Sequence, residues 1–457
     1  MNKKGTLQTT LTRLLLSLLV LIVIASPGQT AVQAGVPAGT IAYVRYDPAD
    51  GDEIHLIEPD GSGDRVIFAT GQPLSEYLTD IKQLDWKPDA SELAFSSSHE
   101  AGCSLFETDI YTIRPDGRKY RRISGPPACG AAAGLPTGTV IVPVENASSE
   151  SGVFTIYFEG APGPIEVALF PGSAVDVTFY NVADYGDEEQ WAIWMYGKYR
   201  NYYPGAIVDV KPGATVETGP LEIHTGLTNY GYSYPNYLPD GSAIGALFQE
   251  TALFTLPSNN ADFGFAGTKD SLNMTMAAKN LAWGPTPGLE NIVLFHGWTT
   301  DDSYAGKNPI MMADVRDQAG SMLVDVDPTR LGKWVLGITW LPDGSGFLYS
   351  LSELVGYDDR ANIWEYSFAT GQSKRVTNVP YGFAREITVS PDGQTILFEL
   401  QPSGHWYDVN PAIDLWMVNR DGSGMGVFLE DARSPAWSSQ AIPEIVEHNV
   451  FLPFTIR

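Results

Sequence analysis

The chain has 457 residues and a formal net charge of −26, from 28 Lys and Arg against 54 Asp and Glu. Hydrophobic residues make up 44% and charged residues 18%, a balance that excludes a disordered acidic tail. The acidic excess argues against a nucleic-acid partner, because phosphate groups are bound by Lys and Arg. The aromatic content, with 11 Trp, 22 Tyr and 19 Phe, favours β structure.

Residues 1–34 have the pattern of a secretory signal. A basic start that includes Lys3 and Arg13 precedes an almost unbroken apolar run over residues 14–25, and small residues follow up to Ala34. The run is shorter than the roughly 20 residues that span a bilayer. The alternative to a cleaved signal is an uncleaved membrane anchor. We therefore expect a cleaved signal peptide, a secreted, periplasmic or cell-surface location, and no membrane span after cleavage.

The chain has two cysteines, Cys103 and Cys129. In an exported protein such a pair most simply forms a disulfide, with two buried free thiols as the alternative. Two cysteines cannot build a four-thiolate zinc site. The prediction is a Cys103–Cys129 disulfide.

A repeated pattern organises the chain: an apolar or aromatic residue, a Pro-Asp-Gly-like turn, and an alternating apolar strand. Pro fixes φ at the first corner, Asp bonds its own backbone and Gly accepts a positive φ, so each turn closes a hairpin. The aromatic or apolar residue that opens each copy is Trp86, Tyr237, Trp283, Trp340, Val389 or Trp437. From Tyr237 onward the spacing is roughly 46 to 57 residues, the size of one four-stranded propeller blade.

The units continue with a third strand and a second turn, as in residues 109–117 and 414–422. The first unit, residues 40–68, lacks a first strand, and the strand around Trp437 would supply it. A missing first strand matched by a surplus last strand predicts ring closure, which removes an exposed sheet edge. We expect an all-β fold, a six-bladed β-propeller in which Trp437 lies beside Ile41.

The series of Trp-x-Pro-Asp-Gly, Phe-x-Ser, Asp-Ile-Tyr and Asp-Gly motifs resembles the repeats of the TolB-like six-bladed β-propellers, which are similar to WD repeats. The same repeat occurs in the propeller domains of dipeptidyl- and oligopeptidases. The resemblance covers about 310 of the 457 residues, and the units at Tyr237 and Trp283 depart from its consensus. It is specific for fold and weak for function.

An insert separates the second unit from the third, because the distance from Trp86 to Tyr237 leaves roughly 85 to 95 extra residues. Its expected strands are residues 140–144, 153–158, 165–170, 175–180, 191–196 and 206–210. Pro-Gly pairs lie between some of these strands, and the insert has the length of a small β-sandwich. The expected organisation is a signal peptide (1–34), blades 1 and 2 (35–130), an inserted β-sandwich (131–222), blades 3 to 6 with the closing strand (223–440), and a C-terminal tail (441–457).

Blade geometry divides the connections between two faces. The turns between strands 1 and 2, and between 3 and 4, lie on one face and are short. The expected longer loops on the other face are residues 47–52, 99–107, 299–309, 357–361 and 405–411. The insert and both cysteines belong to this loop face, so we expect binding there.

The loop face is rich in acidic residues, which suggests a site for a cation or a basic partner; a solvated loop surface is the alternative. The candidate ligand-binding residues among these loops are Asp301, Asp302, Asp358, Asp359 and His405.

An aromatic run in the insert is denser than a half-buried strand requires. Its members are Trp191, Trp194, Tyr196, Tyr199, Tyr202 and Tyr203. Aromatic platforms stack on sugar rings, which suggests carbohydrate binding. Side chains alternate across a strand, so burial on both faces explains the run equally well.

Known catalytic motifs are missing from the sequence. There is no Gly-x-Ser-x-Gly elbow, no phosphate loop or dinucleotide fingerprint, and none of the six histidines has metal-binding spacing. We therefore predict no catalytic, metal or cofactor residue, and a monomeric binding or scaffold protein for a protein or glycan. The alternative is a degenerate propeller lyase or hydrolase for polysaccharide or peptide, in which His99, His405 and neighbouring acids form the site.

Overall fold

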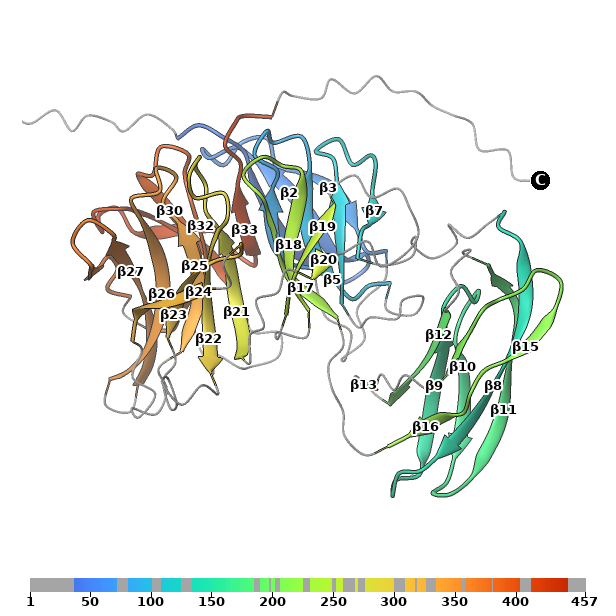
Figure 1. Cartoon of the computed structure of the whole chain (residues 1–457). Helices are drawn as coiled ribbons and strands as arrows, with labels where there is room; N and C mark the ends of the chain where they lie inside the picture. The colour runs from blue at the N-terminus through green and yellow to red at the C-terminus, as the bar shows by residue number, and fades with distance from the viewer. Residues whose placement is uncertain are drawn as a thin grey trace, which may run out of the picture. The chain divides into compact units, whose positions relative to one another are not determined.

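The computed structural model describes residues 37–71, 81–100, 108–124, 134–184, 190–196, 199–201, 206–224, 231–248, 252–257, 268–269, 276–299, 309–316, 319–325, 334–355, 358–379, 381–402 and 412–442. Within these ranges the fold is all-β: every regular element is a strand (Figure 1). None of these residues belongs to a helix that could cross a membrane.

Most strands form antiparallel sheets of four in which each strand pairs with the next. One sheet contains β4 (Lys82–Trp86), β5 (Leu93–Ser97), β6 (Asp109–Ile113) and β7 (Arg121–Arg122). Another contains β17 (Tyr232–Tyr237), β18 (Ala243–Phe248), β19 (Ala252–Pro257) and β20 (Thr268–Lys269). A third contains β21 (Met276–Trp283), β22 (Ile292–Thr299), β23 (Ile310–Asp314) and β24 (Ala319–Val324).

Two further sets of four are joined into one eight-stranded sheet by a single parallel pair, Ala361 with Phe383. The first set is β25 (Val335–Trp340), β26 (Gly346–Val355), β27 (Asp358–Ser367) and β28 (Gln372–Arg375). The second is β29 (Phe383–Val389), β30 (Thr395–Gln401), β31 (Asp414–Asn419) and β32 (Gly426–Leu429).

The remaining set of four combines strands from the two ends of the described chain. It contains β1 (Ile41–Asp47), β2 (Gly51–Ile57), β3 (Arg65–Ala69) and β33 (Arg433–Trp437), in the order β3-β2-β1-β33. In the antiparallel register Trp437 is opposite Ile41, the strand pairing that the sequence predicts.

One strand of each set contacts the corresponding strand of the next, and we call β33, β4, β17, β21, β25 and β29 the inner strands. Contacts run from β33 to β4, then through β17, β21 and β25 to β29, and from β29 back to β33. Each inner strand has a register shift in its pairing with the neighbour of its own sheet. At these bulges Gln83, Tyr234, Asn280 and Ser434 have φ near +50°, a conformation that side chains rarely adopt.

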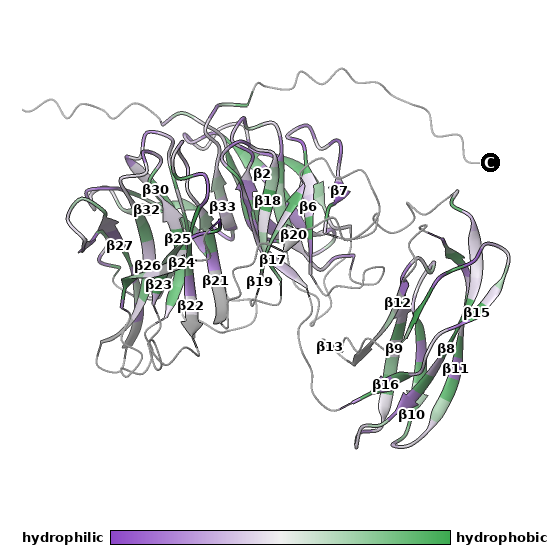
Figure 2. Cartoon of the chain, in the orientation of Figure 1, coloured by the Kyte–Doolittle hydropathy of each residue, from purple (hydrophilic) through white to green (hydrophobic). Residues whose placement is uncertain are grey.

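The Pro-Asp-Gly segments form the tight turns that the sequence predicts. In the turn after β17, Asp240 Oδ1 accepts the backbone N–H and the hydroxyl of Ser242, at 2.9 and 2.7 Å, and Gly241 has a φ of +69°. Asp60 and Ser62 repeat this arrangement. Figure 2 shows hydrophobic stretches along strands such as β2 and hydrophilic stretches in the turns.

Residues 134–224 form two sheets around one hydrophobic core that includes Val142, Ile156 and Phe179. One sheet contains β8 (Thr137–Asn146), β11 (Ala174–Ala183), β15 (Thr215–Glu217) and β16 (Leu221–Ile223). The other contains β9 (Gly152–Phe158), β10 (Ile165–Leu169), β12 (Gln190–Tyr196), β13 (Tyr199–Asn201) and β14 (Ile207–Val208). The sequence predicts strands at β8 to β12 and β14, but misses β13, β15 and β16, which are only three residues long.

Two of the expected long loops are wrong. A three-residue turn separates β1 from β2, because Asp47 Oδ1 accepts the backbone N–H groups of Ala49 and Asp50 and so tightens it. The expected loop over 357–361 is largely strand, since β27 begins at Asp358 and pairs with β26 from Val355 onward. Extended pairing of two long strands therefore replaces the loop in which Asp358 and Asp359 were expected.

Candidate functional site

All six inner strands line a cavity of about 120 Å³. Its polar lining includes Asp85, Asn236, Asn280, Thr339, Glu386 and Thr388. Four of these side chains occupy the same position of the repeat, directly before the aromatic or apolar residue that opens each copy. They are Asp85 before Trp86, Asn236 before Tyr237, Thr339 before Trp340 and Thr388 before Val389. The repeat therefore places a polar side chain in the cavity from four of the six inner strands.

These polar side chains bond the backbone of the next inner strand. Asp85 Oδ2 accepts the N–H of Tyr237 at 2.6 Å, and Asn236 Oδ1 accepts the N–H of Trp283 at 2.5 Å. Thr388 Oγ1 accepts the N–H of Trp437 at 3.1 Å. The cavity wall thus joins β4 to β17, β17 to β21, and β29 to β33.

Tryptophan and glycine complete the remaining junctions. Trp86 Nε1 donates to the carbonyl of Ala436 at 3.1 Å, and Trp340 Nε1 donates to the carbonyl of Ala282 at 3.0 Å. Between β25 and β29 the backbones approach closely: a Cβ on Gly337 would lie 3.1 Å from a carbonyl oxygen of β29. Most of the hydrogen bonds described at the cavity wall therefore hold neighbouring inner strands together.

Two carboxyl groups of the cavity have strongly raised pKa values. Burial raises the pKa of Asp85 to about 7, against the lowering effect of its bond from the Tyr237 N–H. Burial and then the charge of Glu399 raise the pKa of Glu386 to about 8. Both groups exchange protons near neutral pH, the range in which carboxyl groups serve as general acids or bases.

A second polar cluster lies at the ends of β5 to β7 and contains His99, which the alternative enzyme hypothesis used. The ring nitrogens of His99 lie 2.7 Å from the Ser97 hydroxyl and 2.8 Å from the Tyr120 hydroxyl. Burial, and then the charge of Arg122, lower the pKa of His99 to about 4. The imidazole is therefore neutral at pH 7.

Beside His99 lies a buried group of charges. The Arg122 guanidinium is 3.5 Å from Asp109 and 3.8 Å from Glu100. Ser124 Oγ donates to Asp109 at 2.6 Å and accepts the N–H of Ile110 at 2.9 Å. Burial raises the pKa of Glu100. The cluster thus combines a neutral imidazole with a carboxyl group that is easier to protonate than usual.

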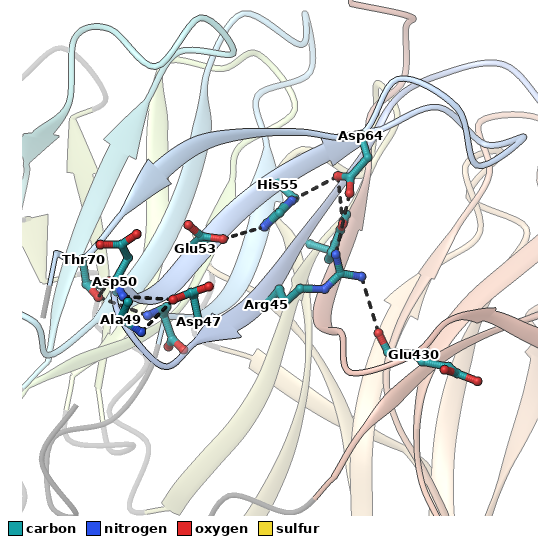
Figure 3. Close-up of polar contacts among 11 residues, drawn as sticks. Arg45, Asp47, Ala49, Asp50, Glu53, His55, Asp64, Thr70 and Glu430 are labelled. Atoms are coloured by element: carbon teal, nitrogen blue, oxygen red, sulfur yellow. Dashed lines mark hydrogen bonds and ion pairs between the residues drawn. The ribbon is translucent and has the colours of Figure 1, made fainter. Parts of the chain in front are cut away.

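A third cluster, shown in Figure 3, lies on β1 and β2. Asp64 Oδ1 accepts the Tyr43 hydroxyl at 2.8 Å and lies 3.0 Å from His55 Nδ1, while His55 Nε2 lies 3.0 Å from Glu53. Arg45 approaches Asp64 at 3.7 Å and donates to the carbonyl of Glu430 at 3.5 Å. These contacts tie the β1–β2 hairpin to the segments before β3 and β33, which is a structural role.

Many sequence-predicted site residues fall on parts of the chain that the structure leaves undescribed. Cys103, Cys129, Tyr202, Tyr203, Asp301, Asp302 and His405 lie outside the described residues. Trp191, Trp194 and Tyr196 belong to β12, Tyr199 to β13, and Asp358 and Asp359 to β27, as backbone positions only. Sequence reasoning missed Asp85 and Glu386. Comparing the position before the opening residue across units would have found Asp85.

Solved structures that resemble this one include TolB from Acinetobacter baumannii, with 15% identity over 88% of this chain and 67% of that chain (TM-score 0.39). Another is the β-propeller domain of the Trilobed protease from Pyrococcus furiosus, with 8% identity over 86% and 94% (TM-score 0.37). Oligogalacturonate lyase from Vibrio parahaemolyticus matches with 8% identity over 86% of each chain (TM-score 0.35). No family model and no curated protein matches the chain. TolB and other propeller proteins are thus among the structures to which this chain is similar.

Proposed function

We propose that the chain is an exported, monomeric, six-bladed β-propeller that binds a protein or a glycan outside the cytoplasm. In this proposal β33 closes the ring, the two-sheet unit is an inserted β-sandwich, and binding uses the sandwich and the loop face. The run of contacts among the six inner strands and the pairing of Trp437 with Ile41 support the ring. The signal pattern of residues 1–34 supports export.

The observation that carries the binding proposal is the exposure of two aromatic side chains in the sandwich. Phe170, which follows β10, is 69% exposed, and Tyr180 on β11 is 65% exposed. They are the most exposed of the large hydrophobic side chains in the described part of the chain. Rigid aromatic rings supply much of the contact area in protein interfaces and stack on sugars.

The test is a pull-down and a glycan array with the mature chain and with the double variant Phe170→Ser/Tyr180→Ser. We expect the variant to lose at least about tenfold in affinity for the partner found, roughly 1.4 kcal/mol. Tyr381→Ser is the matched control, because Tyr381 is 49% exposed and lies outside the sandwich. Binding that survives deletion of residues 133–220 would refute the sandwich as the binding element.

A second candidate function is that of a degenerate enzyme acting on polysaccharide or peptide. The neutral His99 beside Glu100, and the raised pKa values of Asp85 and Glu386, favour it. The same incubations, examined by mass spectrometry for shortened glycans or peptides, distinguish the two functions. Turnover that His99→Gln abolishes would replace binding with catalysis.

We also propose that Cys103 and Cys129 form a disulfide, because an exported chain with two cysteines most simply pairs them. The intact mass of the native protein is expected to rise by about 2 Da on reduction. Alkylation of unreduced protein at either cysteine would show free thiols and reject the bond.

A further inference from the structure

A second cavity, of about 500 Å³, is lined by residues from the β4–β5 turn and the β6–β7 turn. Four cationic side chains line it, together with Glu92 and Tyr120: Lys87, Arg114, Lys119 and Arg121. The whole chain has only 28 Lys and Arg against 54 Asp and Glu. A cationic lining in so acidic a protein is a local reversal of charge.

The acidic residue of the lining does not cancel these charges. Glu92 is buried; its Oε1 accepts from Arg121 at 2.9 Å and its Oε2 accepts from the Tyr237 hydroxyl at 3.1 Å. Arg121 therefore neutralises Glu92. Within the described chain no ion pair involves the other three cations, Lys87, Arg114 and Lys119. The lining thus has a net charge of +3, the sum of four cations and one carboxylate.

The lining is also held in place. The stem of Lys87 packs on the next turn, since a Cβ on Gly241 would lie 2.8 Å from Lys87 Cε. Lys119 has a φ of 55°, a strained conformation for a non-glycine residue that the surrounding turn imposes. Tyr120 stacks on Phe68 with ring centroids 5.0 Å apart and bonds His99 through its hydroxyl. The Lys87 stem, the Lys119 backbone and the Tyr120 ring are therefore fixed before any ligand arrives.

A cavity at the turns of two other sets of strands has a different lining. That cavity, of about 240 Å³, is lined by Asp343, Asp392 and Arg420 among others. Arg420 is occupied by a bidentate pair with Glu365, at 2.7 and 2.9 Å. The position of Lys87, directly before Pro-Asp, holds Leu or Ser in the units at 238, 341 and 390. The repeat fold therefore does not require a cation at the position of Lys87.

We propose that the larger cavity binds a sugar that carries carboxylate, phosphate or sulfate groups. Lys and Arg side chains are the natural partners of such oxyanions. The volume lies within the usual range of small-ligand sites, and Tyr120 adds an aromatic side chain to the lining. The lining comes from the short turns and contains no residue of the loops or of the sandwich in the proposed function, so the site does not depend on them.

Isothermal titration of the full mature protein with glucuronate, glucose 6-phosphate, inorganic phosphate and glucose tests the proposal. We expect at least one charged sugar to bind, glucose not to bind, and affinity to fall at high salt. Lys87→Leu/Lys119→Gly is expected to weaken binding by about tenfold or more. Leu is the residue of the unit at 341, and Gly accepts the positive φ, so the fold tolerates both changes.

The matched control is Lys374→Gln, which removes an exposed positive charge on β28 and is expected to leave affinity unchanged. Failure of every charged probe to bind would overturn the site, as would equal affinity in the cavity variant and the control. Inorganic phosphate that binds as tightly as the sugar phosphate would overturn the sugar-binding part. The double variant Phe170→Ser/Tyr180→Ser leaves the cavity unchanged. A failure of the cavity to bind charged sugars is therefore distinguishable from a failure of the proposed function.

Discussion

Arg433→Met is expected to lower the free energy of unfolding by about 3–5 kcal/mol, the largest single-site effect that the structure suggests. Arg433 lies on β33, and its guanidinium bonds both carboxylate oxygens of Asp52 on β2 at 2.6 Å. Asp52 is fully buried, and its Oδ2 also accepts the N–H of Ile81 at 2.8 Å. Removing the cation takes both guanidinium bonds from a buried carboxylate, whose charge is costly away from water, and this is why the loss is large.

Urea unfolding followed by tryptophan fluorescence measures this effect. Arg118→Met is the control: it removes an exposed arginine and is expected to change stability by no more than about 0.5 kcal/mol. Adding Asp52→Asn to Arg433→Met should recover part of the loss, since the buried negative charge disappears. A loss as small as that of the control would mean that the Arg433–Asp52 pair does not hold β33 in its sheet.

Asp85→Asn is expected to stabilise the protein by about 2–4 kcal/mol at pH 8 and to have little effect near pH 4. The folded-state pKa of Asp85, about 7, is raised above its ordinary value of 3.8. Stability from this group is therefore full below about pH 4 and is lost as the pH rises toward and through 7. Asparagine keeps an oxygen to accept the Tyr237 N–H and never ionises. Asn236 already does this for Trp283 in the next sheet.

Unfolding titrations at several pH values between about 4 and 8 give the comparison. Asp89→Asn is the control with the opposite sign, because bonds from Ser91 lower the pKa of Asp89 and the ionised form is the stabilising one. In the Asp85→Asn variant, stability should still fall somewhat as the pH rises, because the pKa of Glu386 is also raised. A wild-type stability that does not fall between pH 5 and 8, with Asp85→Asn no more stable, would contradict the prediction.

Much of the fold could be predicted because its turns and strands have local signals. The Pro-Asp-Gly turns bring their own hydrogen-bond acceptor, as Asp240 and Ser242 show. Alternating apolar residues fix the strands between turns, and the leftover strand at Trp437 has one obvious partner beside Ile41. Loop lengths were predicted less well, because whether residues 357–361 form a loop depends on pairing with β26 and not on their own composition.

The cavities could not be predicted in the same way, since they depend on which side chains distant turns bring together. Lys87 and Lys119 are 32 positions apart, and only the packing of β4 to β7 makes them line one cavity. A net charge of −26 for the chain conceals that local excess of cations. The raised pKa of Glu386 similarly depends on its burial and then on the charge of Glu399 on the neighbouring strand, neither of which its local sequence indicates.

The pairing of β33 with β1 has a consequence for biosynthesis. The backbone N–H of Thr40 donates to the hydroxyl of Ser438, 398 positions away in the sequence. Such a contact pays a large loop-closure entropy and forms late. During translation the edge of β1 therefore stays open until β33 is released, and the nascent chain needs protection from aggregation over that interval.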